Sequence, residues 1–429
     1  MIRFRDVLKD KNFLFLWLGQ VISNFGDRLT QMALVALVYQ RSPGSAMALA
    51  KLISFTVIPV FLIGPIAGVW VDRLNRRNVM IISDLLRGGL ILTIPLFIAA
   101  NQTILVYLVV FLAFSISRFF IPSKMALIPD LVSKDKLLVA NTLSDTTHMI
   151  GNVVGLVAAG ILVNIRTIGA IGGFYIDAAT FFISALLIGM IIPREFVRTV
   201  KGNLELTRAA LGKSFRRSIL AEIREGLIYL TRYNETRFIV YVFFLLMAGI
   251  GAVSCVIVVF IQDSFRTATR DLGLLGMFLV GGLFFGALLY GRFGQKADKR
   301  RVIHSSFVAS GLFIMIFTFC VRGYPNLFIA GLVAAALGAS ISPITASMNT
   351  LTHEMIPEGA RGRIFSSLET VMHLGFLIFM FAAAYLTKYV DRFWILIVTG
   401  AIFSICGIGG IISGGERPRA TYPSSSSLS

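Results

Sequence analysis

The stretch FLFLWLGQVISNFGDRLTQMALVALVYQ, residues 13–40, carries an acid and a base, Asp27 and Arg28, in the middle of an apolar run. About 20 apolar residues are enough for a helix to cross the hydrocarbon core of a bilayer, and this run is longer. It therefore predicts a membrane-spanning helix. A charge at the bilayer centre costs roughly 2.5–3.5 kcal/mol, so we expect both charges to face protein or water.

Similar runs recur along the whole chain. Of its 429 residues, 56% are hydrophobic and 14% are charged, whereas about a quarter of a soluble domain is charged. The sequence therefore predicts an all-α, polytopic membrane protein with 12 transmembrane helices in two six-helix halves. The predicted spans are 13–40, 46–71, 78–99, 104–126, 138–163, 168–192, 237–262, 272–293, 302–321, 326–350, 364–387 and 393–413.

The basic residues set the expected orientation. With the N-terminus inside, 29 of the 40 Lys and Arg residues fall in cytoplasmic segments and 8 in outer loops. Such an excess marks the cytoplasmic side of a membrane protein. We therefore expect a multi-pass protein of the inner (cell) membrane with both termini in the cytoplasm. The net charge of +18 has the same origin, so we expect no nucleic-acid partner.

Polar stretches divide the chain into four predicted parts. These are an N-terminal six-helix bundle (1–192), a cytoplasmic linker (193–236), a C-terminal six-helix bundle (237–413) and a disordered tail (414–429). Within the linker one helical face is apolar, which predicts an amphipathic helix along the inner membrane surface. That face is formed by Ile219, Leu220, Ile223 and Leu227.

The two halves resemble each other in sequence. IPDLVSKDKLLVANTLSDT, around spans four and five, aligns with THEMIPEGARGRIFSSLET, around spans ten and eleven. The alignment pairs Asp130 with Glu354 and Asp145 with Glu369. Duplicated six-helix halves are typical of transporters, in which the substrate path runs between the halves.

The loop after the second predicted span reads GVWVDRLNRRNVM, residues 68–80. Here the chain resembles the major facilitator superfamily, whose signature runs Gly-x-Leu-Ala-Asp-Arg-x-Gly-Arg-Arg/Lys. Trp70 and Asn75 stand where the signature has Leu and Gly. The matching residues are Gly68, Asp72, Arg73, Arg76 and Arg77.

The resemblance implies a gating role for this loop. In the family, the acid of the loop holds the start of span eleven while the inner gate is shut. Asp72 would be that acid, and the start of span eleven, beyond Arg361 and Arg363, would be its contact. The corresponding loop of the second half, GRFGQKADKRRV, has Gln295 in place of the acid. Only the first copy is therefore complete.

Four further stretches resemble the macrolide-efflux and enterobactin-exporter branch of the superfamily, whose members are proton-coupled exporters. These stretches are FLFLWLGQVISNFGD, MALIPDLVSKDKLLVANTL, FYIDAATFFISALLIGM and EGARGRIFSS. SNFGD, at the end of the first stretch, and the second stretch also resemble the lysophospholipid transporters. The resemblance implies transport of small amphipathic molecules, with the proton gradient as energy source and no cofactor.

Three predicted spans carry a single polar face, which is typical of helices that line a water-accessible cavity. Spans one and five share the spacing i, i+4, i+7 and i+11, and span eleven carries a shorter version. The three sets are Gln20, Asn24, Asp27 and Gln31; Asn141, Asp145, His148 and Asn152; and Ser366, Glu369, Thr370 and His373.

Asp27 is the predicted proton-coupling residue. Arg28 lies about 100° away around the helix, and the sequence does not identify its partner. By resemblance, spans one and four both line the cavity, so we expect Arg118 to pair with Asp27. Two roles are open for Asp27: a permanent ion pair that fixes helix packing, or a carboxylate that exchanges its proton as the cavity opens to alternate sides.

Other charged residues within the spans receive simpler interpretations. Asp84 and Arg87 are expected to form a helix-packing pair, and Asp177 is expected to be structural. Glu369 is the main embedded acid of the second half and a further candidate for coupling. His148 and His373 are interpreted as polar cavity residues, because no metal-ligand spacing accompanies them.

The favoured function is a secondary transporter that exports amphipathic small molecules, such as a drug, a macrolide-like compound or a siderophore, by proton-coupled alternating access. One alternative is a lysophospholipid flippase that works without a proton gradient. Another is a sensor or scaffold on the same fold. The sequence lacks a nucleophile–base set, a phosphate-binding loop and a metal cluster, so we expect no enzyme. The expected partners are the substrate, protons and the lipid bilayer, and we expect a monomer.

Overall fold

The computed structural model describes residues 4–71, 74–192, 234–294, 297–355 and 361–413. These residues form one short helix, one 3-10 turn and twelve long helices. In chain order they are α1 (Phe4–Leu8), α2 (Lys11–Arg41), α3 (Ala46–Val71), α4 (Arg76–Ala99), α5 (Thr103–Leu131), η1 (Lys134–Lys136), α6 (Leu137–Asn164), α7 (Gly169–Gly189), α9 (Asn234–Phe265), α10 (Arg270–Phe293), α11 (Lys299–Gly323), α12 (Leu327–Met355), α13 (Arg361–Leu386) and α14 (Arg392–Ser413).

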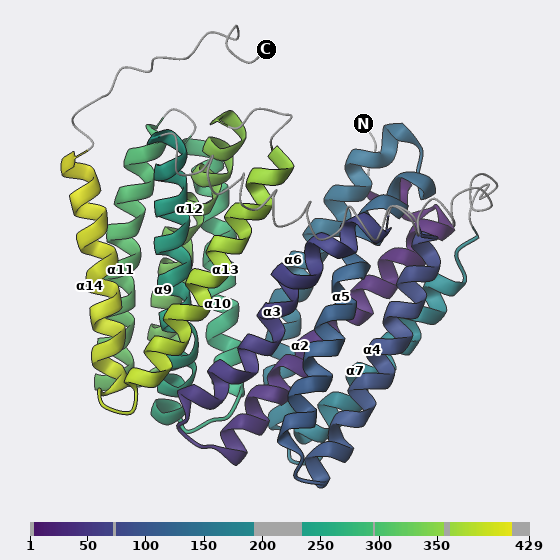
Figure 1. Cartoon of the computed structure of the whole chain (residues 1–429), viewed down its shortest axis with the longest axis horizontal. Coiled ribbons are helices and arrows are strands. Elements are labelled where there is room, and N and C mark those ends of the chain that lie inside the picture. Colours follow the sequence, from purple (N-terminus) through teal and green to yellow (C-terminus); the bar gives the residue numbers. More distant parts are fainter. Residues whose placement is uncertain (1–3, 72–73, 193–233, 295–296, 356–360, 414–429) are drawn as a thin grey trace, which may run out of the picture.

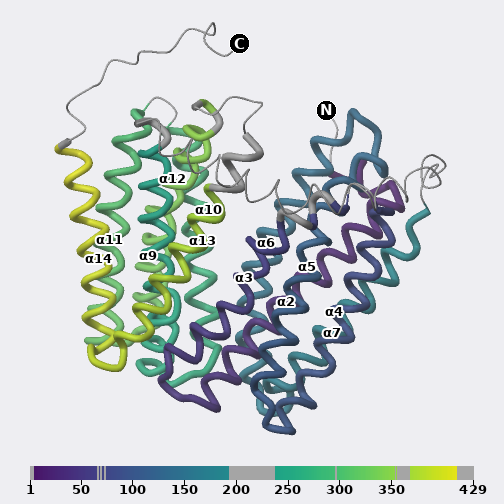
Figure 2. The backbone as a smooth tube through the Cα atoms, in the orientation of Figure 1, coloured from purple at the N-terminus to yellow at the C-terminus, as the bar shows by residue number. Residues whose placement is uncertain are grey.

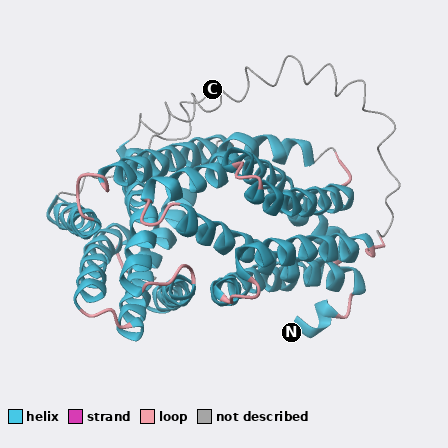
Figure 3. Cartoon of the chain, turned by 90° about the horizontal axis from the view of Figure 1, so that it is seen from below, coloured by secondary structure: helices cyan, strands magenta, loops and turns pink. Residues whose placement is uncertain are grey.

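Eleven helices in the described part of the chain are long and apolar enough to cross a membrane. The twelfth long helix, α2, has 31 residues, and its charged and amide side chains lower its mean hydropathy. It packs along α6 and α7, which are both membrane-crossing candidates. The described residues contain no strand (Figure 3). The predicted all-α architecture with 12 transmembrane helices is therefore confirmed.

Two helices that follow a turn begin at a capping side chain. Asn75 precedes α4, and its side chain accepts a hydrogen bond from the backbone N–H of Asn78 (3.2 Å). Asp298 precedes α11 and accepts from the N–H of Arg300 (3.0 Å). Asn and Asp are favoured at this position because they satisfy an N–H that the helix leaves open. Asn75, which stands where the loop signature has Gly, therefore serves as the N-cap of α4.

The long helices form two groups of six, α2–α7 and α9–α14 (Figures 1 and 2). We call the side of the molecule on which α2 begins and α14 ends the termini side, and the opposite side the far side. The loops at 42–45 and 387–391 lie on the far side. Figure 1 shows the two groups close together on the far side and diverging toward the termini side.

Contacts between the groups run from α6 to α10 and from α3 to α9 and α13. They enclose an apolar cluster that includes Ala46 and Ala50 of α3 and Cys255 and Met380 of the second group. Small residues bring the backbones together. A Cβ atom on Gly160 of α6 would lie 2.7 Å from the carbonyl oxygen of Thr269. The Thr269 hydroxyl also donates to the Gly160 carbonyl oxygen (3.0 Å).

Several predictions fall outside the described residues. The predicted amphipathic linker helix, with Ile219, Leu220, Ile223 and Leu227, lies within 193–233, and the predicted disordered tail within 414–429. Helix α9 begins at Asn234, a few residues before the start of the span predicted from residue 237.

Candidate functional site

Charged and amide side chains gather in the first group of helices, between α2 and its neighbours. Asp27 on α2 forms an ion pair with Arg87 on α4. Only 9% of the Arg87 side chain and 28% of the Asp27 side chain is exposed. The Arg87 guanidinium also lies over the ring of Phe181 on α7, 4.0 Å from its centroid, a favourable cation–π geometry. Arg87 therefore joins three helices.

This pairing corrects two sequence-based predictions. Asp27 pairs with Arg87 and not with Arg118: α4 and α2 both pack against α7, and the long Arg87 side chain extends from α4 over Phe181 of α7 to reach Asp27. Arg87, in turn, makes its ion pair with Asp27 and not with Asp84. Asp84 instead accepts a hydrogen bond from the Ser184 hydroxyl of α7 (2.6 Å), and it is fully buried.

Arg118 on α5 lies half-buried within electrostatic range of charges from both groups. Its Nε and Nη2 atoms donate to the hydroxyl of its neighbour Ser117 (3.2 and 3.0 Å). It interacts through space with Asp27 and Arg87 and with Glu369 of α13. Arg118 and Glu369 thus connect the charged cluster of the first group electrostatically to the second.

Arg28, which had no predicted partner, binds two side-chain amides. Its Nε donates to Asn152 Oδ1 of α6 (3.2 Å), and its Nη1 donates to Gln31 Oε1 one turn along α2 (2.6 Å). Its aliphatic stem lies against Gly155, where an added Cβ would be 3.0 Å from Arg28 Cγ. The predicted divergence of Asp27 and Arg28 is therefore confirmed, since they reach different helices.

The polar face of α2 contributes both to helix packing and to the group of charged side chains around Asp27 and Arg87. Gln20 is buried and accepts a hydrogen bond from the Ser144 hydroxyl of α6 (3.1 Å). Asn24 is half-buried one turn before Asp27. The Trp17 indole donates to Thr147 Oγ1 of α6 (2.9 Å). Trp17 and Gln20 therefore attach this face to α6, and Asp27 attaches it to α4.

Helix α6 presents Asp145 and His148 as exposed side chains. His148 lies in the field of Lys124, Arg28, Asp27 and Asp145. Lys124 of α5 also approaches the Ser144 hydroxyl (3.4 Å). Sequence reasoning missed Lys124, although the predicted span 104–126 contains it and α5 continues to Leu131. The signal was available, since Lys124 is the lone Lys in the apolar run FFIPSKMALIP.

In the second group, α13 carries Glu369 and His373. Glu369 is exposed, and its backbone carbonyl oxygen lies 2.8 Å from His373 Nδ1. The His373 ring lies 6.2 Å from the ring of Phe61 on α3, between centroids. His373 therefore contacts the first group of helices. The described residues contain no cluster of three His, Cys, Asp or Glu side chains that could hold a metal ion.

Two arginines of the signature loop attach it to the ends of neighbouring helices. Gly68 lies in the last turn of α3. Arg76 forms an ion pair with Asp130 at the end of α5 (2.8 Å). Arg77 donates to the carbonyl oxygens of Ile188 and Gly189 at the end of α7. Asp72 and Arg73, like the side chains at the start of α13, lie outside the residues whose side chains are described.

The second half repeats the first of these contacts. Lys299 at the start of α11 forms an ion pair with Glu354 near the end of α12 (2.5 Å). The repeat alignment pairs Glu354 with Asp130, so the two acids hold equivalent positions. Each pair fastens the start of one helix to the end of the next.

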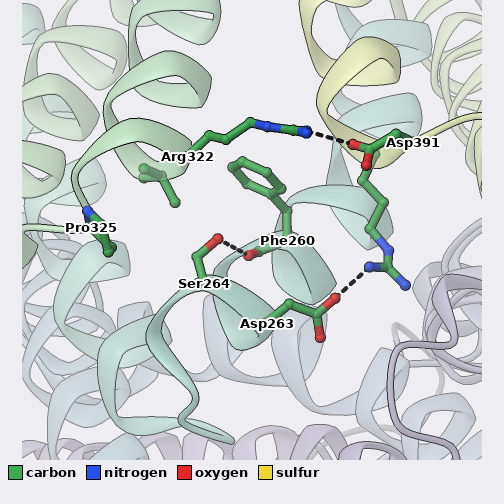
Figure 4. Close-up of a pocket in the computed structure, with 8 residues that line it drawn as sticks. Phe260, Asp263, Ser264, Arg322, Pro325 and Asp391 are labelled. Atoms are coloured by element: carbon green, nitrogen blue, oxygen red, sulfur yellow. Dashed lines mark hydrogen bonds and ion pairs between the residues drawn. The ribbon is translucent and has the colours of Figure 1, made fainter.

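On the far side, Arg392 bridges the two groups. It forms an ion pair with Asp263 at the end of α9, and its Nη2 donates to the Gly44 carbonyl oxygen in the loop after α2 (2.6 Å). Arg322 and Asp391 form a neighbouring ion pair (3.0 Å). These four charged side chains line a pocket of about 300 Å³ together with Phe260, Ser264, Val321 and Pro325 (Figure 4).

Comparison with known proteins shows the family to which the chain belongs. Residues 6–406 match the family described as transmembrane secretion effector. Macrolide efflux protein A of Streptococcus pyogenes is 24% identical over 365 residues, which cover 84% of this chain and 86% of that protein. The multidrug efflux pump Tap of Mycolicibacterium fortuitum is 25% identical and covers 82% of this chain and 83% of its own length.

Solved structures share the fold at lower identity. A bacterial homologue of the iron transporter ferroportin, in its inward-facing state, has a TM-score of 0.68 at 15% identity and covers 93% of this chain and 98% of its own. The nucleoside transporter NupG has a TM-score of 0.72 at 12% identity and covers 95% of this chain and 100% of its own. Both therefore share the fold of the present chain.

Proposed function

Since the chain belongs to the transmembrane secretion effector family of the major facilitator superfamily, and is a membrane transporter rather than an enzyme, we propose that it is a proton-coupled exporter of amphipathic small molecules. The relatives named for macrolide and multidrug efflux support export. Its coupling residue in this proposal is Asp27, which would exchange its proton with the water-accessible cavity that the polar helix faces predict.

The partly exposed Asp27–Arg87 ion pair carries the proposal. A carboxylate at mid-membrane depth is costly unless it is paired or functional. With 28% of its side chain exposed, Asp27 remains accessible to a proton although it is paired with Arg87. The exposed acids Asp145 and Glu369 are further proton acceptors in this proposal, and Arg118 and His148 set the charge around them.

The proposed orientation follows the basic residues. In this proposal the protein is a monomer in the inner membrane, and both of its termini lie in the cytoplasm. The far side is then the outer side. The bridge from Arg392 to Gly44 then closes the outer side, which corresponds to the inward-facing state of alternating access. Asp72 would hold the start of α13 when the inner side closes in its turn.

The experiment is efflux of ethidium and resistance to erythromycin in an efflux-deficient bacterial host, with and without a protonophore. The wild type should lower dye accumulation and lose this effect when the protonophore is added. Asp27→Asn should accumulate dye as cells without the transporter do, because its amide cannot exchange a proton. Asp135→Asn, at an exposed position outside the cluster, is the matched control and should behave as the wild type.

Two results would contradict the proposal. Gradient-driven efflux that survives intact in Asp27→Asn would remove Asp27 from the coupling mechanism. Transport that is insensitive to the protonophore would remove proton coupling and favour the lysophospholipid alternative, which lysophospholipid uptake into proteoliposomes then tests directly.

A further inference from the structure

Three carboxyl groups surround a single guanidinium between α2, α4 and α7. Asp27 holds the ion pair with Arg87. Asp84 on α4 and Asp177 on α7 both interact through space with Arg87 and with Asp27. Both are 0% exposed. Among the described residues, Arg87 is the one cation that interacts with either of these two buried acids.

Charge balance limits how many of these acids can be ionised. Removing a carboxylate from water costs several kcal/mol, which only a well-placed opposite charge offsets. One guanidinium compensates one carboxylate, and Asp27 has taken that position. Asp84 and Asp177 would then be uncompensated anions in the fully buried interior, next to the charge of Asp27.

The hydrogen bonds of the buried acids come from neutral groups. Ser184 donates to Asp84 Oδ2 (2.6 Å). The Thr180 hydroxyl donates to the Asp177 backbone carbonyl oxygen (2.7 Å) and lies 3.3 Å from Asp177 Oδ1. Asp84 Oδ1 and Arg87 Nε are buried without a hydrogen-bond partner among the described residues. An ionised Asp84 would normally engage both of its oxygens with donors. One engaged and one open oxygen suits a carboxylic acid better.

We propose that Asp84 and Asp177 form a proton-binding site, in which both are neutral carboxylic acids while Asp27 is ionised and paired with Arg87. Arg87 follows Asp84 by three positions on α4, so the two lie on one face of the helix. When Arg87 turns from Asp27 to Asp84, the proton leaves the Asp84 oxygen and a new O–H bond forms at Asp27. Asp27, the partly exposed member, then exchanges that proton with water.

The protonation of Asp84 and Asp177 is independent of the proposed export, whereas the use of the relayed proton rests on it. The test is therefore spectroscopic. Infrared spectra of the purified full-length protein in lipid nanodiscs, recorded in water and in deuterated water, detect the carbonyl stretch of protonated carboxyl groups. The wild type should show this band, and Asp84→Asn and Asp177→Asn should each remove part of it.

Two further variants make the test specific. Asp135→Asn changes an exposed acid and should leave the band unchanged. Ser184→Ala removes the donor to Asp84, so it should shift the band in frequency without removing it, and it also serves if Asp84→Asn fails to fold. Spectra of Asp84→Asn and Asp177→Asn that match the wild type, or no shift in Ser184→Ala, would overturn the proposal. A wild type with the band but without protonophore-sensitive efflux would instead contradict the proposed function alone.

Discussion

The neighbouring side chains of Asp27 and Arg28 bind α2 to two different helices. Asp27 takes a cation on α4, and Arg28 takes the amides of Gln31 and, on α6, Asn152. A cation held by neutral amides keeps its own charge uncompensated, whereas the Asp27–Arg87 pair is neutral. Because Asp27 is paired with Arg87, Arg28 places a positive charge without a paired acid next to α6, where the exposed Asp145 and His148 lie.

The pairing of Asp27 with Arg87 predicts an asymmetric response to arginine substitutions. Arg87→Gln leaves Asp27 without its counter-ion and should lower stability, by up to about 3 kcal/mol given that breaking a buried pair costs roughly 3–5 kcal/mol and Asp27 is partly exposed. Thermal unfolding of the detergent-purified protein measures the effect.

Two variants control this measurement. Arg118→Gln removes a cation that donates to the hydroxyl of its neighbour Ser117 and not to a carboxylate among the described residues, so it should lower the melting temperature less. The double variant Asp27→Asn/Arg87→Gln removes both charges and should recover part of the loss. A larger loss in Arg118→Gln than in Arg87→Gln would contradict the observed pairing.

At the scale of elements, α2 fits closely against α7 because Gly26 has no side chain. A Cβ atom at this position would lie 2.0 Å from Thr180 Oγ1 and 2.3 Å from Asp177 Oδ1. The glycine therefore sits directly over the buried acid Asp177. The same approach of helices brings Phe181 of α7 under the Arg87 guanidinium.

Substitution of Gly26 should be costly for this reason. Gly26→Val forces α2 and α7 apart, and overpacking of this kind costs about 1–3 kcal/mol or more. The matched control is Gly89→Ala on α4, where an added Cβ meets nothing within 4 Å, and where Ala gains up to about 1 kcal/mol of helix propensity over Gly. Melting temperatures should therefore move in opposite directions, and equal shifts would contradict the packing described.

The equivalent ion pairs of the two halves permit a second comparison of elements. Partly exposed pairs contribute roughly 0.2–1 kcal/mol, so double-mutant cycles on Arg76–Asp130 and Lys299–Glu354 should give similar coupling energies in this range. Charge-neutral variants of each residue, singly and in pairs, supply the cycles through thermal unfolding. A measurable coupling in one half and none in the other would show that the two pairs are not equivalent.

The sequence predicted the limits of the helices far better than it predicted which side chains pair between helices. Span limits were correct within a few residues because apolar runs end at caps such as Asn75 and Asp298. The polar face of α2 was also predicted, since spacing fixes which residues share a face. Spacing does not determine how that face is turned, so Asp27 was assigned to α5 when it contacts α4. Arg87 was assigned to Asp84 because three-residue spacing is visible in sequence and a long-range pair is not.

At the scale of the whole molecule, the two groups of helices are joined on the far side by an arginine bridge, by a hydrogen bond from Thr269 to Gly160 and by a layer of apolar contacts. The Arg392 guanidinium spans the interface, and Asp263 holds it in place. Close contact between α6 and α10, through Gly160 and Thr269, forms a second junction. Opening of this side requires both junctions to separate.

Removal of the bridge should favour the open far side. Arg392→Ala loses both the Gly44 contact and the Asp263 pair, so spin labels at Pro43→Cys and Lys388→Cys, two exposed loop positions, should move apart on average. Double electron–electron resonance measures this distance. Arg322→Ala breaks a pair within one group and should leave the distribution unchanged, and an unchanged distribution in Arg392→Ala would remove the bridge from the closure mechanism.

Arg392 binds a backbone oxygen, not a side chain, in the loop that it reaches. Gly44 presents this oxygen from a left-handed conformation with φ of +72°, which most other residues adopt only with strain. The loop can therefore exchange its neighbouring side chains without losing the bridge, provided that the backbone keeps its course. Sequence variation in this loop is thus separated from closure, because the bridge depends on the backbone at Gly44 and not on the side chains beside it.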